Sequence, residues 1–145
     1  MKIRFGCADD LQFIIAADEE TRILEKRVDL KLSSSDIDSI KEEIRKKELL
    51  VLEEEGYIIG FISFKSDFEV MGLLDKVFWI DLVFVKKEYR QKGIGRRLYR
   101  EAFKIAREKG YKKVYAEIYE LNKGSKAAHE KMGFKPALTI FEKKI

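Results

Sequence analysis

Two glycines one residue apart, Gly93 and Gly95, stand between an apolar run and a segment with helical spacing. Glycine lets the backbone turn sharply and expose consecutive N–H groups at the start of a helix, where the helix dipole also favours negative charge. Cationic side chains surround the same point at Arg90, Lys92 and Arg96. Amides and cations gathered at one helix start predict a cradle for a phosphate or diphosphate group.

Two common phosphate-binding motifs do not account for this loop. The dinucleotide fingerprint needs a third small residue, but Leu98 stands in that place. The Walker loop needs a Gly-Lys-Ser/Thr triplet, which does not follow here. What remains is an Arg/Gln-x-x-Gly-x-Gly/Ala arrangement, which Arg90, Gly93 and Gly95 satisfy. A tight turn without a ligand is the plain alternative for the two glycines taken alone.

A second group of polar residues follows the loop along the chain. Glu117 occupies a polar position in the segment 113–119, which alternates like a strand, and Asn122 follows five residues later. The only histidine, His129, comes seven residues after Asn122, in a short segment that Gly133 ends. A carboxylate and an imidazole are groups that exchange protons, so this set predicts acid–base chemistry.

The order of these motifs resembles the GCN5-related N-acetyltransferase (GNAT) family, in which the glycine loop holds the pyrophosphate of acetyl-coenzyme A. The resemblance covers about residues 77–136, and the first half matches only in its order of elements. The spacing of Glu117, Asn122 and His129 is similar to the subgroup that acetylates ribosomal-protein N-termini. The His-Glu-Lys-x-Gly-Phe sequence also resembles amino-acid acetyltransferases. The resemblance implies acetyl-CoA as cosubstrate and one N-acetyltransferase domain over residues 1–145.

The resemblance also implies which residues contact the cosubstrate. The expected acetyl-CoA contacts are Val83, Phe84, Val85, Arg90, Gln91, Lys92, Gly93, Ile94, Gly95, Arg96 and Asn122. Asn122 is expected beside the pantetheine arm. Exposed backbone N–H groups of residues 83–85 are expected to stabilise the oxyanion of the reacting carbonyl. No metal ligand is expected.

Acetyl transfer from a thioester requires a neutral amine, although a lysine side chain has a reference pKa near ~10.4. Glu117 is the first candidate for the base that removes the proton, and Asp81 is the second. Each has a plain alternative as a solvated carboxylate on a strand. His129 stands where the ribosomal-protein subgroup has a tyrosine that protonates the leaving thiolate. It is therefore either the acid of the reaction or a half-buried histidine that lines the cofactor cleft.

The elements that must position these residues follow from hydrophobic periodicity. Residues 77–85 are almost continuously apolar, which is typical of a central strand covered on both faces. A helix is expected to start near Gly93 or Ile94 and to end at Gly110. The other expected strands are 2–7, 49–52, 57–64, 113–119 and 137–143; the other expected helices start at Asp9 or Asp10, at Ser35 or Asp36 (to about Lys47), and at Ser125 (to Met132). This order predicts a mixed α/β sheet, and the resemblance implies the GNAT acyl-CoA N-acyltransferase fold with about six to seven strands and four helices.

The composition excludes several classes of function. Thirty lysines and arginines nearly balance 26 acidic residues, and the net charge of +4 indicates no specific nucleic-acid partner. One cysteine and one histidine exclude a disulfide framework and a multi-ligand metal site, and Cys7 is expected to be a buried structural thiol. No apolar run approaches the roughly 18–20 residues that span a bilayer, so a cytoplasmic protein without membrane attachment is expected. The low amide content resembles that of hyperthermophile proteins.

The leading hypothesis is an N-acetyltransferase that moves the acetyl group from acetyl-CoA to a primary amine by direct attack in a ternary complex. The alternative is a non-catalytic CoA- or acyl-CoA-binding sensor or regulatory module, which would need neither Glu117 nor an acceptor pocket. The acceptor is expected to be a small-molecule or peptide amine. Glu19, Glu20 and Glu25 in the leading helices are candidates for attracting a cationic acceptor. A homodimer is compatible with the sequence.

Overall fold

The fold is built on one mixed β-sheet, seen in a computed structural model that describes residues 1–73 and 75–145. The strands lie in the order β1-β2-β3-β4-β5. The first four pair antiparallel, and β5 pairs parallel to β4. The strand bounds are β1 Lys2–Phe5, β2 Leu49–Glu54, β3 Tyr57–Phe68, β4 Val77–Val85 and β5 Val114–Ala116.

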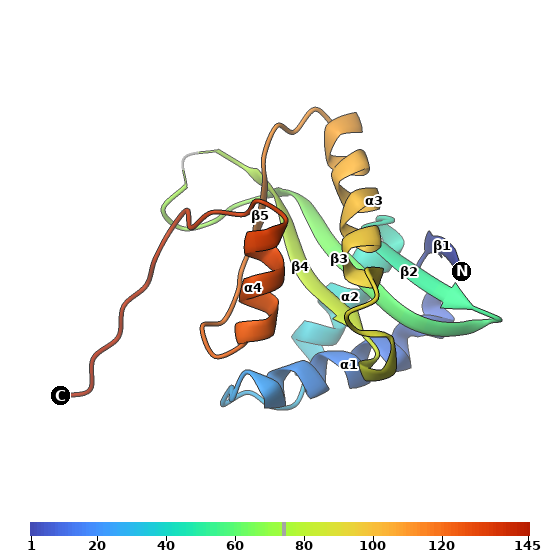
Figure 1. Ribbon diagram of the computed structural model, residues 1–145, viewed down its shortest axis with the longest axis horizontal. Helices are drawn as coiled ribbons and strands as arrows, with labels where there is room; N and C mark the ends of the chain where they lie inside the picture. Colours follow the sequence, from blue (N-terminus) through green and yellow to red (C-terminus); the bar gives the residue numbers. More distant parts are fainter. Residues whose placement is uncertain (74) are drawn as a thin grey trace.

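Helices cover both faces of this sheet (Figure 1). Two helices that precede β2 lie against one face, whereas α3 lies against the other face with α4 beside it. The helix bounds are α1 Leu11–Leu24, α2 Ser34–Arg45, α3 Ile94–Glu108 and α4 Lys123–Lys131, with short 3-10 turns η1 Ala8–Asp10 and η2 Lys87–Tyr89. None of the helices described is long and apolar enough to cross a membrane.

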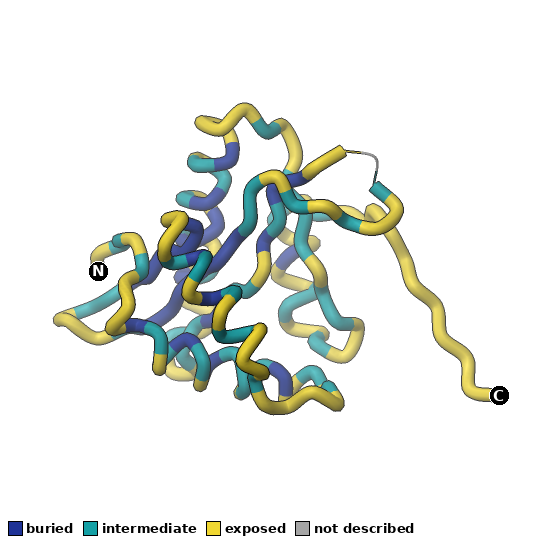
Figure 2. Tube along the Cα trace, turned by 180° about the vertical axis from the view of Figure 1, so that it is seen from behind, coloured by how far each residue is buried: buried dark blue, intermediate teal, exposed yellow. Residues whose placement is uncertain are grey.

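The central strands are apolar throughout because they serve two cores. In β2, Leu50 and Leu52 pack toward α3, whereas Leu49 and Val51 pack toward α1 and α2. Successive side chains of a strand point to opposite faces, so a strand covered on both faces needs apolar residues at every position. Figure 2 shows the resulting band of buried residues through the middle of the molecule.

A bulge in β4 changes which face its side chains occupy. Ser63 of β3 pairs with Leu82 and the next residue pairs with Ile80, so Asp81 has no partner in the register. Before the bulge, Ile80 packs in the core beside α3; after it, Val83 does so, and Leu82 faces α1 and α2. An unpaired bulge residue is a common device for turning a side chain toward a site.

The second feature that shapes the site is the separation of β4 from β5. The parallel pairing ends at Ile80 and Ala116, although β4 continues to Val85. Residues 117–122 therefore leave the sheet beside the last third of β4. A gap opens between them at the end of the sheet that carries the α3 loop.

The mixed α/β fold class and the four helices expected from the sequence are confirmed, but the expected count of six to seven strands is wrong. The segment 137–143 forms no strand; it extends away from the sheet, with 55% of Leu138 and 82% of Ile140 exposed. The neighbouring edge strand β5 has only three residues, which is too short an edge to hold it.

Several boundaries also differ from those expected. Because the chain turns away after Ala116, β5 ends before Glu117 instead of reaching Tyr119. Helix α2 begins earlier than expected: Ser33 caps it by accepting from Asp36 N at 3.1 Å, and Asp36 accepts in return from Ser33 N at 2.8 Å. Cys7 is exposed, not buried, since β1 ends at Phe5 and the chain has left the sheet by then.

Candidate active site

The glycine loop joins the end of β4 to the first turn of α3. After η2 the backbone adopts left-handed conformations at Gln91 (φ 61°) and Gly93 (φ 79°), and α3 begins at Ile94. Residues with a side chain rarely adopt this conformation, which explains why a glycine, Gly93, directly precedes the helix. The first-turn N–H groups of α3 have no acceptor within the helix, so they point into the loop's open side.

Gly95 is the more informative glycine, because neither its backbone conformation nor its neighbours in the chain require a glycine at this position. Its φ is not positive, and a Cβ built there would meet only Val85 Cγ2 at 3.9 Å, an ordinary contact. The open space lies at the positive end of a 15-residue helix, among exposed Lys92 and Arg96. Amides, helix dipole and cations around an empty space fit a bound diphosphate.

Arg90 braces this loop against the strand it follows. Its Nε donates to the Val85 carbonyl at 2.8 Å, and its guanidinium lies 5.7 Å from the centre of the Phe84 ring. Glu20 of α1 is a distant ion-pair partner at 3.8 Å. Arg90 thus holds the loop at the mouth of the gap. Because its ion pair with Glu20 is long, its positive charge is only partly neutralised.

Only part of the backbone of residues 83–85 faces the gap. Lys86 N donates to Ile59 O at 2.9 Å, which makes Val85 and its partner in β3 a non-hydrogen-bonded pair of the antiparallel ladder. The alternation of the ladder then turns the Phe84 peptide groups toward β3. The peptide groups of Val83 and Val85 point the other way, into the gap. The Phe84 ring packs against Phe13 and Phe61 in the core on the side of α1 and α2.

A cavity of about 320 Å³ continues from this gap between the sheet and the first two helices. It is lined by Asp18, Thr21, Arg22, Glu25, Arg27, Asp36, Ser39, Ile40, Glu43, Lys65, Trp79, Asp81, Leu82, Val83, Glu117, Tyr119, Asn122 and Ser125. Both candidate bases, the β4 backbone and Asn122 therefore share one cavity wall.

Glu117 and Asn122 reach the cavity from the chain that leaves β5. Glu117 is exposed, and no cation lies within ion-pair distance of it among residues 1–73 and 75–145. Asn122 Oδ1 accepts from Ser125 N at 3.2 Å and so caps α4. The cap orients the rest of the Asn122 amide along the cavity wall.

Asp81, the other candidate base, belongs to a cluster with Lys65 and Glu43. Lys65 Nζ lies 3.2 Å from Asp81 Oδ2 and 3.3 Å from Glu43 Oε1. Burial, together with the nearby charge of Asp81, raises the pKa of the Glu43 carboxyl to about 8. Burial alone would lower the pKa of Lys65, but Asp81 and Glu43 together raise it above its ordinary value. Lys65 is therefore a cation near neutral pH, and its firmer partner is Asp81.

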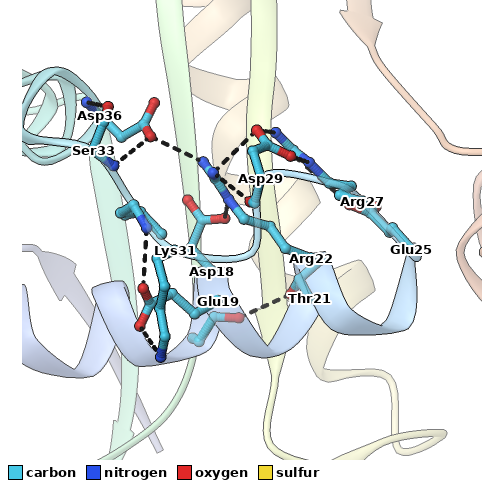
Figure 3. A network of polar contacts seen from close by, with 12 residues as sticks. Asp18, Glu19, Thr21, Arg22, Glu25, Arg27, Asp29, Lys31, Ser33 and Asp36 are labelled. Carbon is cyan, nitrogen blue, oxygen red and sulfur yellow. Dashed lines mark hydrogen bonds and ion pairs between the residues drawn. The ribbon is translucent and has the colours of Figure 1, made fainter.

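A buried arginine holds the opposite wall (Figure 3). Arg22 is only 5% exposed and bonds Asp18 at 3.0 Å, the Asp29 carbonyl at 3.0 Å and, more weakly, Asp36 at 3.5 Å. These contacts tie α1 to the following loop and to the first turn of α2. Arg27 bonds Asp29 beside them, with its guanidinium 5.3 Å from the ring centre of Tyr119.

His129 does not line the cavity. It is 6% exposed, and its Nδ1 lies 2.6 Å from the Ser125 carbonyl, an acceptor, so Nδ1 carries the proton. The Tyr99 hydroxyl then donates to Nε2. Burial lowers the pKa of His129, and Phe134 packs edge-on against its ring. Both nitrogens are thus engaged in a buried contact between α3 and α4.

Sequence reasoning missed the deepest part of the cavity wall. Glu43 stands in a segment whose pattern indicates only an amphipathic helix, and Lys65 comes directly after the expected strand 57–64. The structure continues β3 to Phe68, four residues beyond the expected end, and this places Lys65 in the sheet. Of the acidic residues expected to attract a cationic acceptor, Glu25 lines the cavity, whereas Glu19 and Glu20 do not.

A second hollow, of about 410 Å³, lies between β1, β2 and the back of α3. Its polar lining is Arg97, Glu101, Lys104 and Glu108, and none of the predicted site residues reaches it. It also lies on the side of α3 away from the β4–β5 gap. The smaller cavity is the candidate active site, because it holds both candidate bases and the part of β4 that leads toward the loop.

The chain is similar to known proteins in sequence and in fold. Residues 14–134 match the family model described as the acetyltransferase (GNAT) family. The BH1408 protein of Bacillus halodurans, solved as a mutant, is 17% identical with a TM-score of 0.80, covering 100% of this chain and 99% of that one. AAC(6')-Iy in complex with a CoA-containing bisubstrate analogue is 19% identical with a TM-score of 0.75, covering 99% and 97%. A ribosomal-protein-alanine N-acetyltransferase from Brucella melitensis is 25% identical with a TM-score of 0.70, covering 93% and 85%.

The buried contact of His129 predicts a pH-dependent loss of stability. Because the folded pKa is lowered below the ordinary ~6.5, the unfolded chain binds a proton that the folded chain does not, and stability falls as pH drops below about 6.5. His129→Asn keeps a donor for the Ser125 carbonyl but leaves Tyr99 unpaired. We expect it to cost about 1–3 kcal/mol at neutral pH and to remove this acid-side slope.

The measurement is urea unfolding of both proteins at a series of pH values. Glu43 has the opposite slope, since its raised pKa makes stability fall as pH rises from the ordinary value toward about 8. The difference between variant and wild type isolates His129. An unchanged acid-side slope in the variant would show that His129 is not buried as a neutral group.

Proposed function

Because the chain belongs to the GNAT acetyltransferase family, we propose that it transfers the acetyl group of acetyl-CoA directly to a primary amine within a ternary complex. One observation carries the proposal. The glycine loop at the start of α3 opens beside the unpaired edge of β4, and that edge leads into the cavity that holds Glu117. The candidate diphosphate loop, the extended edge of β4 and the candidate base follow one another in the order that acetyl-CoA and an amine would require.

The loop residues are proposed to bind the diphosphate. Amides of the first turn of α3 would donate to it, and Lys92 and Arg96 would neutralise its charge. The absence of a side chain at Gly95 lets the anion approach the helix start. Arg90 would hold the loop in place through its hydrogen bond to the Val85 carbonyl and would add positive charge at the mouth of the gap.

The gap is proposed to hold the pantetheine arm and the thioester, which supplies the acetyl group. The Val83 N–H would donate to the carbonyl oxygen that gains charge during the attack, since it points into the gap beside the cavity. The amide of Asn122, held in place by the α4 cap, would contact the arm from the other side. The backbone of Val85 shares the gap but its carbonyl is occupied by Arg90.

Glu117 is proposed to be the base that takes the proton from the acceptor ammonium. It faces the cavity without a competing cation in the described part of the chain, so its oxygens are free to accept. Asp81 is second, because one of its oxygens already accepts from Lys65 at 3.2 Å. Proton removal by a positioned carboxylate needs direct or one-water reach of the amine, which the shared cavity allows.

His129 is proposed to position α4 rather than to protonate the thiolate. An acid must present a proton to the leaving sulfur, whereas the single proton of this imidazole is donated to the Ser125 carbonyl. The contact with Tyr99 ties the helix that Asn122 caps to α3. The thiolate can leave without an enzymatic acid, since an ordinary thiol has a pKa of about 8.5.

The acceptor is proposed to be a small cationic amine. The cavity wall carries six carboxylates and three cations, which favours a positively charged guest. The similar structures include both an aminoglycoside N-acetyltransferase, AAC(6')-Iy, and a ribosomal-protein-alanine N-acetyltransferase. The acid-rich cavity has a volume of about 320 Å³, which favours a small molecule over the N-terminus of a folded protein.

Gly95→Leu separates diphosphate binding from folding. A Cβ at this position meets only Val85 at 3.9 Å, so we expect an unchanged or slightly higher unfolding temperature, because glycine is a poor helix former. The side chain would fill the diphosphate space, and acetyl-CoA affinity should fall by roughly tenfold to a hundredfold, about 1.4–2.8 kcal/mol. Titration calorimetry measures it.

Arg100→Leu is the matched control, with the same side chain on an exposed position farther along α3. It should bind acetyl-CoA within about twofold of wild type. Equal affinity for wild type and Gly95→Leu would place the diphosphate elsewhere and remove the basis of the proposal.

The two candidate bases are distinguished by isosteric amides. We expect Glu117→Gln to lower kcat by roughly a hundredfold or more, in the range of general-base catalysis. Asp81→Asn should change kcat by less than about tenfold and act mainly on KM for the amine, because it alters the charge of the wall. The measurement is thiol release with a saturating amine, alongside acetyl-CoA binding to each variant. Transfer that survives Glu117→Gln unchanged would move the base elsewhere, and a wild type that binds acetyl-CoA but acetylates no amine would favour a sensor.

A further inference from the structure

Glu43 is the one buried side chain of the cavity wall whose polar atoms are not all satisfied. The residue is 3% exposed, and its Oε2 has no hydrogen-bond partner among the described residues. Its Oε1 lies 3.3 Å from Lys65 Nζ. Buried polar atoms in folded proteins are nearly always paired, so an orphaned carboxylate oxygen beside a cavity points to a partner that is not part of the chain.

The neighbouring cation does not compensate Glu43. Lys65 is shared with Asp81 and makes a hydrogen bond there, at 3.2 Å. The pKa of Glu43 is accordingly raised to about 8, by burial and by the charge of Asp81. A carboxylate that served only to anchor Lys65 would be held ionised by it. Instead, this corner of the cavity has two carboxyl groups, Glu43 and Asp81, for one ammonium group.

The other cations of the wall are engaged away from Glu43. Arg22 bonds Asp18 at 3.0 Å and Asp29 at 3.0 and 3.2 Å. Arg27 bonds Asp29, with the shorter contact at 2.6 Å, and approaches Glu25 at 3.9 Å. The carboxylates left over on the wall are thus Glu43 on α2 and Glu117 on the opposite side.

We propose that Glu43 and Asp81 form a binding site for a second ammonium group of the acceptor. The acceptor is then a dicationic or polycationic amine, with one amine reacting at Glu117 and another seated between α2 and β4. This inference rests on the proposed function, since it identifies the substrate class of the same cavity. Glu43 is a specificity residue here and takes no part in proton transfer from the reacting amine.

Proton release accompanies binding at this site. Near neutral pH the empty site holds a proton on Glu43; an arriving ammonium favours the carboxylate, and the proton leaves to solvent. The titratable groups around Glu43 are Lys65 from β3 and Asp81 from β4, with Asp18 and Arg22 of α1 and Asp36 of α2 farther along the wall. The pKa of Lys65 is raised, so Lys65 keeps its proton in both states and Glu43 is the main source.

The test is calorimetric binding of α,ω-diaminoalkanes and of amino alcohols of the same chain lengths, which carry only one ammonium group. The wild type should bind the best diamine at least about tenfold more tightly than the matching amino alcohol. Repeating the titration in buffers of different ionisation enthalpy should show proton release for the diamine alone. Neither measurement requires turnover.

Three variants assign the effect to the site. Glu43→Gln should weaken diamine binding by about tenfold or more, leave amino-alcohol binding unchanged and abolish proton release. Glu42→Gln is the matched control, because Glu42 is the adjacent residue and its side chain is exposed and paired with Arg45. Lys65→Met should strengthen diamine binding, since it frees both carboxylates for the guest. Tighter diamine binding by Lys65→Met would support the proposed site even if Glu43→Gln folds poorly.

Two results would overturn the inference: equal affinity of the wild type for diamines and amino alcohols, or a diamine preference that persists in Glu43→Gln. In either case acetyl-CoA binding and acetylation of the amino alcohols would still support the proposed function. Conversely, failure to bind acetyl-CoA would remove the proposed function, whereas a Glu43-dependent diamine preference would still stand as a property of the cavity.

Discussion

The candidate site depends on one constraint: β4 is longer than its parallel partner. Pairing with β5 stops at Ile80 and Ala116, so the last residues of β4 have a neighbour on one side only. The ladder with β3 decides which of them turn their peptide groups into the gap, and those are Val83 and Val85. Because the α3 loop starts where this edge ends, an extended ligand can follow the strand from the loop to the cavity.

The cavity itself is maintained by paired charges. Arg22 and Lys65 each hold carboxylates from two or more elements, which keeps α1, α2 and the sheet together around a polar space. Removing Arg22, which is buried, would leave uncompensated carboxylates, which is costly. Yet the pairing is incomplete at Glu43, and an incomplete pair is what a cationic guest can complete.

Much of the site could be predicted because its signals are local. The loop from Arg90 to Arg96 carries its own turn residues and helix start, and the apolar run of β4 indicates a buried strand. The rest depends on tertiary structure. Whether His129 faces the cleft depends on how α4 packs on α3, and Glu43 meets Lys65 only because α2 crosses the sheet. The bulge at Asp81 and the orientation of the Phe84 peptide follow from strand register, which a single sequence does not display.

The most direct measurement is a crystal structure of the protein with a stable conjugate of CoA and a diamine, in which a thioether replaces the thioester. The account predicts the diphosphate on the first-turn amides of α3 beside Gly95, and the sulfur in the gap next to Val83. The linked amine should lie by Glu117, with the free ammonium against Glu43. A diphosphate bound away from residues 90–96, or an arm that runs outside the β4–β5 gap, would contradict it.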